Sequence, residues 1–237
     1  MTNPVPGHPL LAHRSSGVLL HLTSLPGRHG SGDLGPSAHH FLDWLALSGQ
    51  TLWQILPLTP PGAGHSPYQS PSAFAGSPWL VDLDDLAQAG WLERLPDPDL
   101  DADHCDFARV VPYRLSALRA AWRGFDERAN PNDRESLAGF IRAQADWLDD
   151  YALFMVLQDR HGPSWPHWPR PLARRSPQAL QAVRDEAAAE LGFWQFVQWR
   201  FHAQWQRLRE HAHARGIRIV GDAPIFVAHQ SADVWAH

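Results

Sequence analysis

This sequence has little cysteine, a small net charge and no long hydrophobic run. The 237 residues contain one cysteine, Cys105, so no disulfide can form within the chain, which fits a reducing cytoplasm. No secretory signal opens the chain, and no run reaches the roughly 18 apolar residues that a membrane span requires. The formal net charge of −5 argues against nucleic acid or an anionic membrane as a partner. We therefore expect a cytoplasmic protein that binds neither.

The ligand spacings of common metal sites and the P-loop of nucleotide-binding proteins are also missing. The chain has 15 histidines, but none stands in a His-Glu-x-x-His or a Cys/His ligand spacing. No P-loop is present. Cys105 lies in an acidic, loop-like stretch without an obvious activating partner, which is not typical of a catalytic thiol. We therefore expect no metal site and no cofactor.

Tryptophan, in contrast, is abundant, with 12 residues against only 3 tyrosines. Its flat apolar ring with a polar N–H suits both helix cores and sugar-binding clefts. Core packing is the commoner use, so we expect it for most of these tryptophans.

The first part of the chain has the pattern of β/α units. Short apolar runs at 17–22 and 50–57 predict buried strands. Between them, apolar residues at helical spacing predict a helix over 37–48, with Ser37 as N-cap and Gly49 as its end. Strand, helix and strand at this spacing imply that the two strands are parallel.

A long loop rich in proline, glycine and serine follows at 59–78. Loops of this length in compact domains tend to be functional. Ser66, Tyr68, Gln69 and Ser70 place hydroxyl and amide groups on a frame stiffened by prolines. Without Lys or Arg, this set suits a neutral, hydroxyl-rich ligand better than a phosphate. The alternative is a turn whose polar groups satisfy one another.

The remaining chain is mostly helical until its last part. We expect a strand-like segment at 79–82 and helices at 84–90, 113–124, 135–160 and 177–214, with Phe193, Val197, Phe201, Trp205 and Leu208 forming one apolar stripe. The predicted organisation is a flexible N-terminus at 1–16, two β/α units with the polar loop at 17–78, a mostly helical insertion at 79–190, and a helix, third strand and following loop at 191–237.

The third predicted strand, at 217–220, ends in a carboxylate. Asp222 follows Val220 and Gly221, as a residue on the catalytic face of a (β/α)8 barrel strand does. Apolar neighbours on both sides make desolvation costly unless a ligand or an arginine compensates. A helix N-cap or a loop ion pair is the alternative role. His21 and Ser24, which end the first strand, are expected at the same rim.

Together these blocks identify a family. The segments at 20–27 (LHLTSLPG), 53–58 (WQILPL), 66–78 (SPYQSPSAFAGSP), 147–154 (WLDDYALF), 221–228 (GDAPIFVA) and 231–237 (SADVWAH) resemble 4-α-glucanotransferases, also called amylomaltases or disproportionating enzymes. Their order and spacing match across nearly the whole chain. The resemblance implies a (β/α)8 TIM barrel of the α-amylase clan with helical insertions, of which this chain would carry the first three strands.

The resemblance also implies an activity and a set of roles. Family members transfer α-1,4-glucan segments to the 4-hydroxyl of another glucan or of glucose by retaining double displacement. Asp222 matches an acidic residue that supports the glucose at the cleavage site, and Ser66, Tyr68 and Gln69 match a loop that lines the donor side. The expected partners are therefore maltooligosaccharides, while the oligomeric state stays open.

The resemblance places the catalytic carboxyls elsewhere. The family's nucleophile and acid/base follow later strands, beyond His237, so no catalytic residue is assigned, and Asp84 and Asp233 are not substitutes. We expect an unstable, inactive fragment with an open sheet edge. The alternatives are a non-catalytic glucan-binding protein, an incomplete record of a longer chain, and an α-glucan hydrolase of the same clan.

Overall fold

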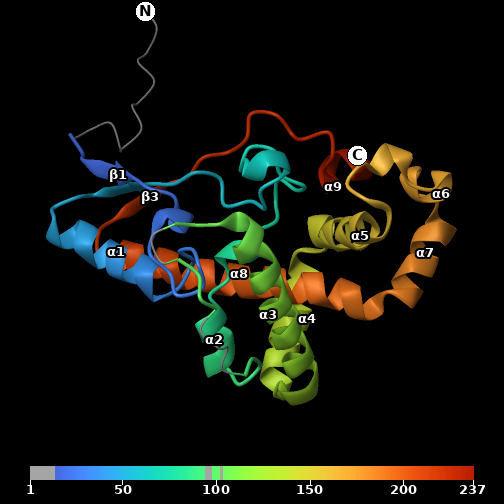
Figure 1. Cartoon of the computed structure of the whole chain (residues 1–237), viewed down its shortest axis with the longest axis horizontal. Helices are drawn as coiled ribbons and strands as arrows, with labels where there is room; N and C mark the ends of the chain where they lie inside the picture. The colour runs from blue at the N-terminus through green and yellow to red at the C-terminus, as the bar shows by residue number, and fades with distance from the viewer. Residues whose placement is uncertain (1–13, 94–97, 102–103) are drawn as a thin grey trace, which may run out of the picture.

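The computed structural model describes residues 14–93, 98–101 and 104–237 of the chain. A small sheet lies at one end of the molecule, and helices extend away from it toward the other end (Figure 1). The predicted flexible N-terminus at 1–16 therefore falls largely outside the described residues. Within them, no helix is long and apolar enough to cross a membrane.

The sheet has three parallel strands in the order β1-β2-β3, which confirms the predicted parallel pairing. The strands are β1 (Gly17–Leu19), β2 (Leu52–Gln54) and β3 (Arg218–Val220), each shorter than the sequence suggested. Their register places Val18, Trp53 and Ile219 side by side on one face. Helices α1 (Pro36–Leu47) and α8 (Ala188–Ala214) pack together beside this sheet (Figure 1).

The strands are not buried throughout, as their apolar runs predicted. Trp53 is fully buried, and its indole Nε1 donates to the Leu20 carbonyl at 2.8 Å. On the opposite face, Leu19 is 58% exposed and Gln54 is exposed as well. Successive side chains of a strand point to opposite faces, and among the described residues the helices cover one face only.

The described helical part contains seven further α-helices and a 3-10 turn that borders the functional site. They are α2 (Leu83–Gln88), α3 (Phe107–Arg128), α4 (Pro131–Ala143), α5 (Ala145–His161), α6 (Arg170–Ala173), α7 (Pro177–Glu186), α9 (Ala232–Ala236) and the 3-10 turn η5 (Trp165–His167). Three other 3-10 turns are η2 (Leu22–Ser24), η3 (Ala63–His65) and η4 (Pro78–Leu80).

Two predicted long helices are each divided in two. The helix expected over 135–160 is broken at Gln144, where α4 ends and α5 begins, and the helix expected over 177–214 is broken at Ala187. Both residues have φ near −112° and positive ψ, outside the helical region. Apolar periodicity continues across each break, so periodicity alone did not reveal it.

Two local predictions are wrong, one about a strand and one about a helix cap. The segment at 79–82 is not strand-like: η4 leads into Asp82, whose side chain accepts from the Asp84 amide and caps α2. Helix α1 begins one residue before Ser37, because Gly35 is its N-cap and Pro36 fills the first helical position.

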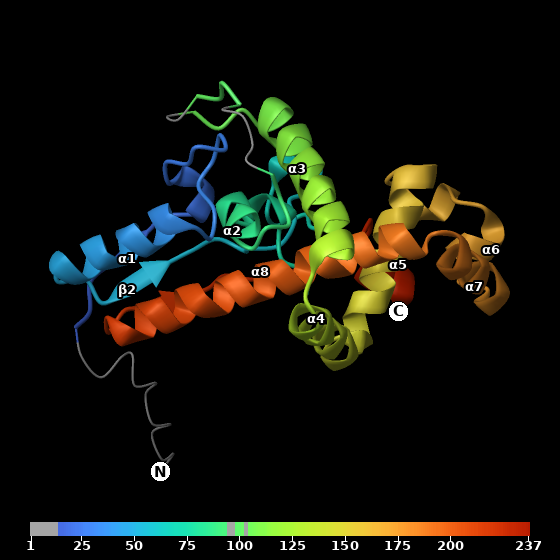
Figure 2. The ribbon, with the colours of Figure 1, turned by 90° about the horizontal axis from the view of Figure 1, so that it is seen from below.

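Helix α8 is the centre of the helical part, and it runs along the length of the molecule in Figure 2. It contacts α1, α3, α4, α5 and α7. Four members of its predicted apolar stripe are buried, namely Phe193, Val197, Phe201 and Leu208, while Trp205 is partly exposed. Six of the 12 tryptophans are buried in the core: Trp53, Trp91, Trp168, Trp194, Trp199 and Trp235. The division at residue 190 falls inside α8, and the proposed domain boundaries stay a prediction.

Candidate functional site

Two buried glutamines of α8 hold the polar loop at 59–78 and the segment that follows it, as far as Asp82. Gln198 accepts from the Gly76 amide at 2.8 Å and donates to the Gly76 carbonyl at 2.9 Å. Gln204 makes the same pair of bonds with Asp82, at 2.8 and 3.1 Å. Gly76 has no room for a side chain, since a Cβ there would lie 2.1 Å from the Phe201 ring. The helix thus holds the loop by its backbone and leaves the loop's other side chains available.

Ser66 and Ser70 shape this loop. The Ser66 carbonyl accepts from the amides of Gly62 and Gln69, and its hydroxyl accepts from the Tyr68 amide at 3.3 Å. Ser70 is buried and its hydroxyl donates to the Ser72 carbonyl at 2.7 Å. For these two serines the geometry favours the alternative of a self-satisfying turn, and a direct contact of Ser66 with a ligand stays a prediction.

Tyr68 and Asp222 meet although 154 positions separate them. The tyrosine hydroxyl donates to Asp222 Oδ2 at 2.8 Å, and the Ala223 amide donates to Asp222 Oδ1 at 2.8 Å. The carboxylate is exposed at the end of β3, and Tyr68 is 43% exposed. The hydrogen bond to Asp222 raises the pKa of Tyr68, because the phenol proton is held between the two oxygens. The pair is an anion with one phenol donor, open to a further ligand.

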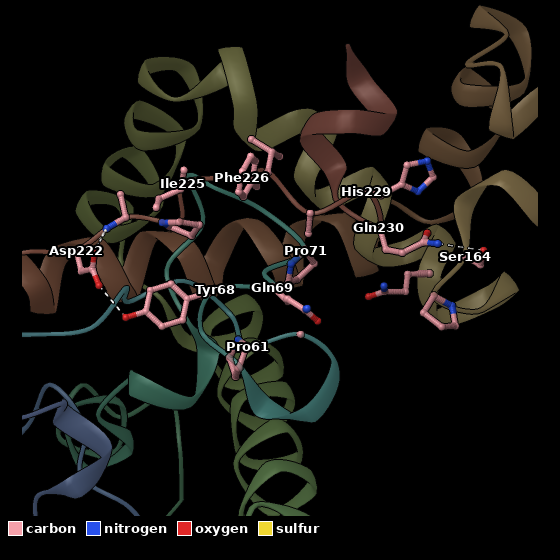
Figure 3. A pocket seen from close by; sticks show the side chains of 17 residues that line it. Pro61, Tyr68, Gln69, Pro71, Ser164, Asp222, Ile225, Phe226, His229 and Gln230 are labelled. Atoms are coloured by element: carbon pink, nitrogen blue, oxygen red, sulfur yellow. Dashed lines mark hydrogen bonds between the residues drawn. The ribbon is translucent and has the colours of Figure 1, made fainter.

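This pair stands at one end of a pocket of about 1200 Å³. Figure 3 shows Asp222 and Tyr68 at one end, Ser164 and Gln230 at the other, and Gln69 and Pro71 between them. The lining residues are Pro61, Gly62, Tyr68, Gln69, Pro71, Gln158, Pro163, Ser164 and residues 222–230. Among these described residues, Asp222 is the one carboxylate, and no arginine or tryptophan takes part.

The loop after β3 presents three apolar side chains to solvent. Ile225 is 92% exposed, Phe226 82% and Val227 53%, and all three line the pocket. At the loop's end, Ser231 is buried and its hydroxyl accepts from the Val234 amide, which caps α9. The pocket wall formed by 222–230 is thus tethered at β3 and at α9.

The far end of the pocket was not predicted from the sequence. Gln158 lies near the end of α5, and Ser164 lies just before η5. Helix packing brings both beside His229 and Gln230. No motif or spacing connects these two stretches, so only their position in the fold reveals them. His21 and Ser24, expected at the rim, do not line the pocket.

The prediction that the protein uses no nucleotide cofactor overlooked a glycine motif. Residues 30–35 (GSGDLG) have the Gly-x-Gly-x-x-Gly spacing of dinucleotide-binding loops and lie between β1 and α1. Residues 29–35 are all buried, however, and a Cβ on Gly35 would lie within 3 Å of the carboxylates of Asp33 and Asp82. Two carboxylates beside the helix start oppose binding of a pyrophosphate there.

Other reactive groups lie outside the pocket. Burial raises the pKa of Cys105, which disfavours a thiolate. Asp233 accepts from the Ala73 amide at 2.9 Å, and Asp84 pairs with Arg28 at 3.2 Å. Among residues 14–93, 98–101 and 104–237, no group of three or more potential ligands could hold a metal ion.

Comparison with known proteins gives consistent matches. The sequence profile of the 4-alpha-glucanotransferase family matches residues 20–237. The 4-alpha-glucanotransferase of Thermus thermophilus is 49% identical over 225 residues, which are 94% of this chain and 45% of that protein. The one from Synechocystis is 44% identical over 96% of this chain and 46% of that protein. The chain thus spans somewhat under half the length of these curated relatives.

Solved structures agree. An amylomaltase from Streptococcus agalactiae, in complex with acarbose, superposes with a TM-score of 0.88 at 34% identity, covering 94% of this chain and 46% of that one. An amylomaltase from Corynebacterium glutamicum has a TM-score of 0.66 at 19% identity, covering 94% of this chain and 32% of that one, which shows a shared fold.

Proposed function

This chain belongs to the 4-alpha-glucanotransferase family, and from that premise we propose that its pocket binds α-1,4-glucans. We further propose that the protein takes part in moving glucan segments to the 4-hydroxyl of an acceptor glucan or of glucose, in the cytoplasm. The three parallel strands would be the first three of a (β/α)8 barrel.

The bond between Tyr68 and Asp222 at the pocket edge is the observation that carries the proposal. One sugar hydroxyl can donate to the carboxylate and a second can donate to the phenol oxygen, whose own proton stays on Asp222, so the pair can bind a glucose unit through two hydroxyls. Gln69 lines the pocket between its two ends (Figure 3), and no protein group within the described residues hydrogen-bonds its side-chain amide.

The rest of the lining also suits a sugar chain. Proline rings and the side chains of Ile225, Phe226 and Val227 supply apolar surface for the C–H faces of pyranose rings. Without an arginine, the lining holds no guanidinium for a phosphate or a carboxylate. The S. agalactiae relative was solved with acarbose, an α-glucan analogue, which supports the same ligand class for this chain.

In this proposal the pocket binds the glucan but does not by itself cleave its glycosidic bonds. Retaining double displacement needs two carboxyl groups about 5 Å apart, one as nucleophile and one as acid and base. The described lining supplies only Asp222, which Tyr68 and the Ala223 amide already engage. We therefore assign binding roles to Asp222, Tyr68 and Gln69, a loop-shaping role to Ser66, and the reacting carboxyls to residues outside these 237.

Incubating the protein with maltotriose tests whether the pocket binds glucans and whether the protein also turns them over. Glucose together with chains longer than maltotriose indicates transfer, whereas shortening alone indicates a hydrolase. Binding of maltotriose without turnover indicates a glucan-binding protein, which the single carboxylate favours as the second candidate. Turnover by the purified 237-residue polypeptide would contradict the proposal that its catalytic carboxyls lie elsewhere.

The length of the protein in its source cells decides which polypeptide to assay. An intact mass well above the 26.6 kDa of this chain assigns transfer to a longer enzyme. A mass equal to it makes binding without catalysis the leading function.

A further inference from the structure

The far end of the pocket is one joined wall. Trp165 Nε1 donates to the His229 carbonyl at 2.7 Å, and the Gln230 amide donates to Ser164 Oγ at 3.3 Å. These bonds connect the segment before α6 with the end of the loop after β3. Ser164, His229 and Gln230 all line the pocket. The wall is therefore formed by two segments that hold each other in place.

Trp165 stabilises this wall from outside the pocket. Its ring stacks on the His229 imidazole, with centroids 5.5 Å apart and planes 20° from parallel. Trp165 is partly exposed and does not line the pocket, whereas His229 does. Stacking and the hydrogen bond to the His229 carbonyl together restrict both the ring and the backbone of that residue. A restricted wall loses little conformational freedom when a ligand binds.

Gln158 adds unused hydrogen-bonding capacity at this end. It lies on α5 four residues before the end cap Gly162, whose amide donates to the Gln158 carbonyl. Gln158 lines the pocket, and no group in the described part of the chain hydrogen-bonds its side-chain amide. A primary amide has two N–H donors and a carbonyl acceptor. With Ser164 and Gln230, it gives the far end three neutral polar side chains and an adjacent apolar ring, that of Pro163.

We infer that Gln158, Ser164 and Gln230 form a distal subsite for a glucose unit of a chain whose other end lies at Tyr68 and Asp222. This inference rests on the proposed glucan binding and specifies chain length as what the far end recognises. The volume of about 1200 Å³ exceeds the roughly 300–1,000 Å³ of common small-ligand pockets. A short oligosaccharide fills only the near end, while a longer one reaches both.

Calorimetric titration of the protein, at the length its source cells make, with maltotriose and maltoheptaose tests the subsite. The wild type is expected to bind maltoheptaose more tightly. Gln158→Ala is expected to reduce that preference by roughly fivefold to tenfold, the size of one or two lost neutral hydrogen bonds. Alanine keeps α5 helical. Ser164→Ala, outside the regular helices, is the second variant and is expected to act in the same direction.

Gln181→Ala is the matched control. Gln181 is an exposed helical glutamine on α7 whose amide bonds Asp185, far from the lining, so its loss is expected to leave the preference unchanged. Equal affinity of the wild type for both sugars overturns the distal subsite alone, as does an unaltered preference in both Gln158→Ala and Ser164→Ala. A wild type that binds neither sugar overturns the glucan proposal and the subsite with it.

Discussion

Two carboxylates of this protein accept hydrogen bonds of the same length in opposite surroundings. Asp33 Oδ2 accepts from Arg114 Nη2 at 2.8 Å, and Asp222 Oδ2 accepts from the Tyr68 hydroxyl at 2.8 Å. Arg114 is fully buried and Asp33 is 8% exposed, whereas Asp222 and Tyr68 are both exposed. Bond length alone therefore does not separate a buried structural pair from an exposed pair that a ligand can reach.

The difference lies in what else each partner holds. Arg114 also donates to the carbonyls of Ser31 and Val81, at 3.0 and 3.1 Å, so it joins the loop before α1 to the segment before α2. Removing Arg114 would leave these buried acceptors without their donor. Tyr68 and Asp222 can exchange their bond for bonds to water or to a ligand hydroxyl. Because the first pair is buried, its bonds are part of the fold. Because the second pair is exposed, it can give up its bond to a ligand.

The largest expected effect comes from breaking the buried pair. Arg114→Met leaves the Asp33 carboxylate and two carbonyls without their donor, and is expected to lower the free energy of unfolding by about 3–5 kcal/mol. Denaturant titration measures it. Adding Asp33→Asn to this variant should recover part of the loss, because it removes the uncompensated charge. A double variant no more stable than the single one would show that the ion pair is not the cause.

The pH dependence of the same region is expected to be nearly as large. Burial, with the nearby charges of Asp33 and Asp85, raises the pKa of Asp82 to about 6. The folded state then holds a proton that the unfolded state releases near pH 4, so Asp82's contribution to stability is present below pH 4 and is lost as the pH rises to 6. The loss is on the order of 2–3 kcal/mol.

Asp82→Asn isolates this contribution, since asparagine also caps a helix and carries no charge. The variant should gain stability relative to the wild type between pH 4 and pH 7, measured by denaturant titration at both. A constant difference across this range would contradict an ionisation of Asp82 coupled to folding.

A smaller loss is expected from the clamp between α8 and the polar loop. Gln198→Ala leaves the buried amide and carbonyl of Gly76 unpaired, which is expected to cost about 2 kcal/mol. Thermal unfolding measures it against Gln206→Ala, a change on the exposed side of the same helix. Equal melting temperatures for the two variants would mean that water replaces the clamp.

The exposed pair is expected to affect stability least and binding most. Asp222→Asn keeps an acceptor for Tyr68 but removes the charge, so the free energy of unfolding should change by less than about 0.5 kcal/mol. Maltotriose affinity should fall about tenfold, as for a lost charge-assisted hydrogen bond. Titration calorimetry measures it, and Tyr68→Phe should act in the same direction. A large loss of stability in Asp222→Asn would erase the distinction between the two pairs.

Local signals predicted the parts of the fold that depend on neighbours in sequence. Gly49, with φ of 71°, follows α1 where the sequence predicted the helix to end, and Gly216, with φ of 70°, follows α8 in the same way. The apolar stripe of α8 is buried at four of its five positions because 3.6-residue periodicity places them on one face. The strand-like segment at 79–82 misled because its apolar residues are buried by tertiary packing within a 3-10 turn and a cap.

By itself, the sequence determined the family, the parallel strand–helix–strand start, and the place of Asp222 after β3, because each is written in contiguous residues. Only the tertiary structure decided that Tyr68 bonds Asp222, that Ser66 turns toward its own loop, and that Gln158 and Ser164 close the far end of the pocket. These contacts join segments up to 154 residues apart. They depend on how helices pack around α8, which no local pattern encodes.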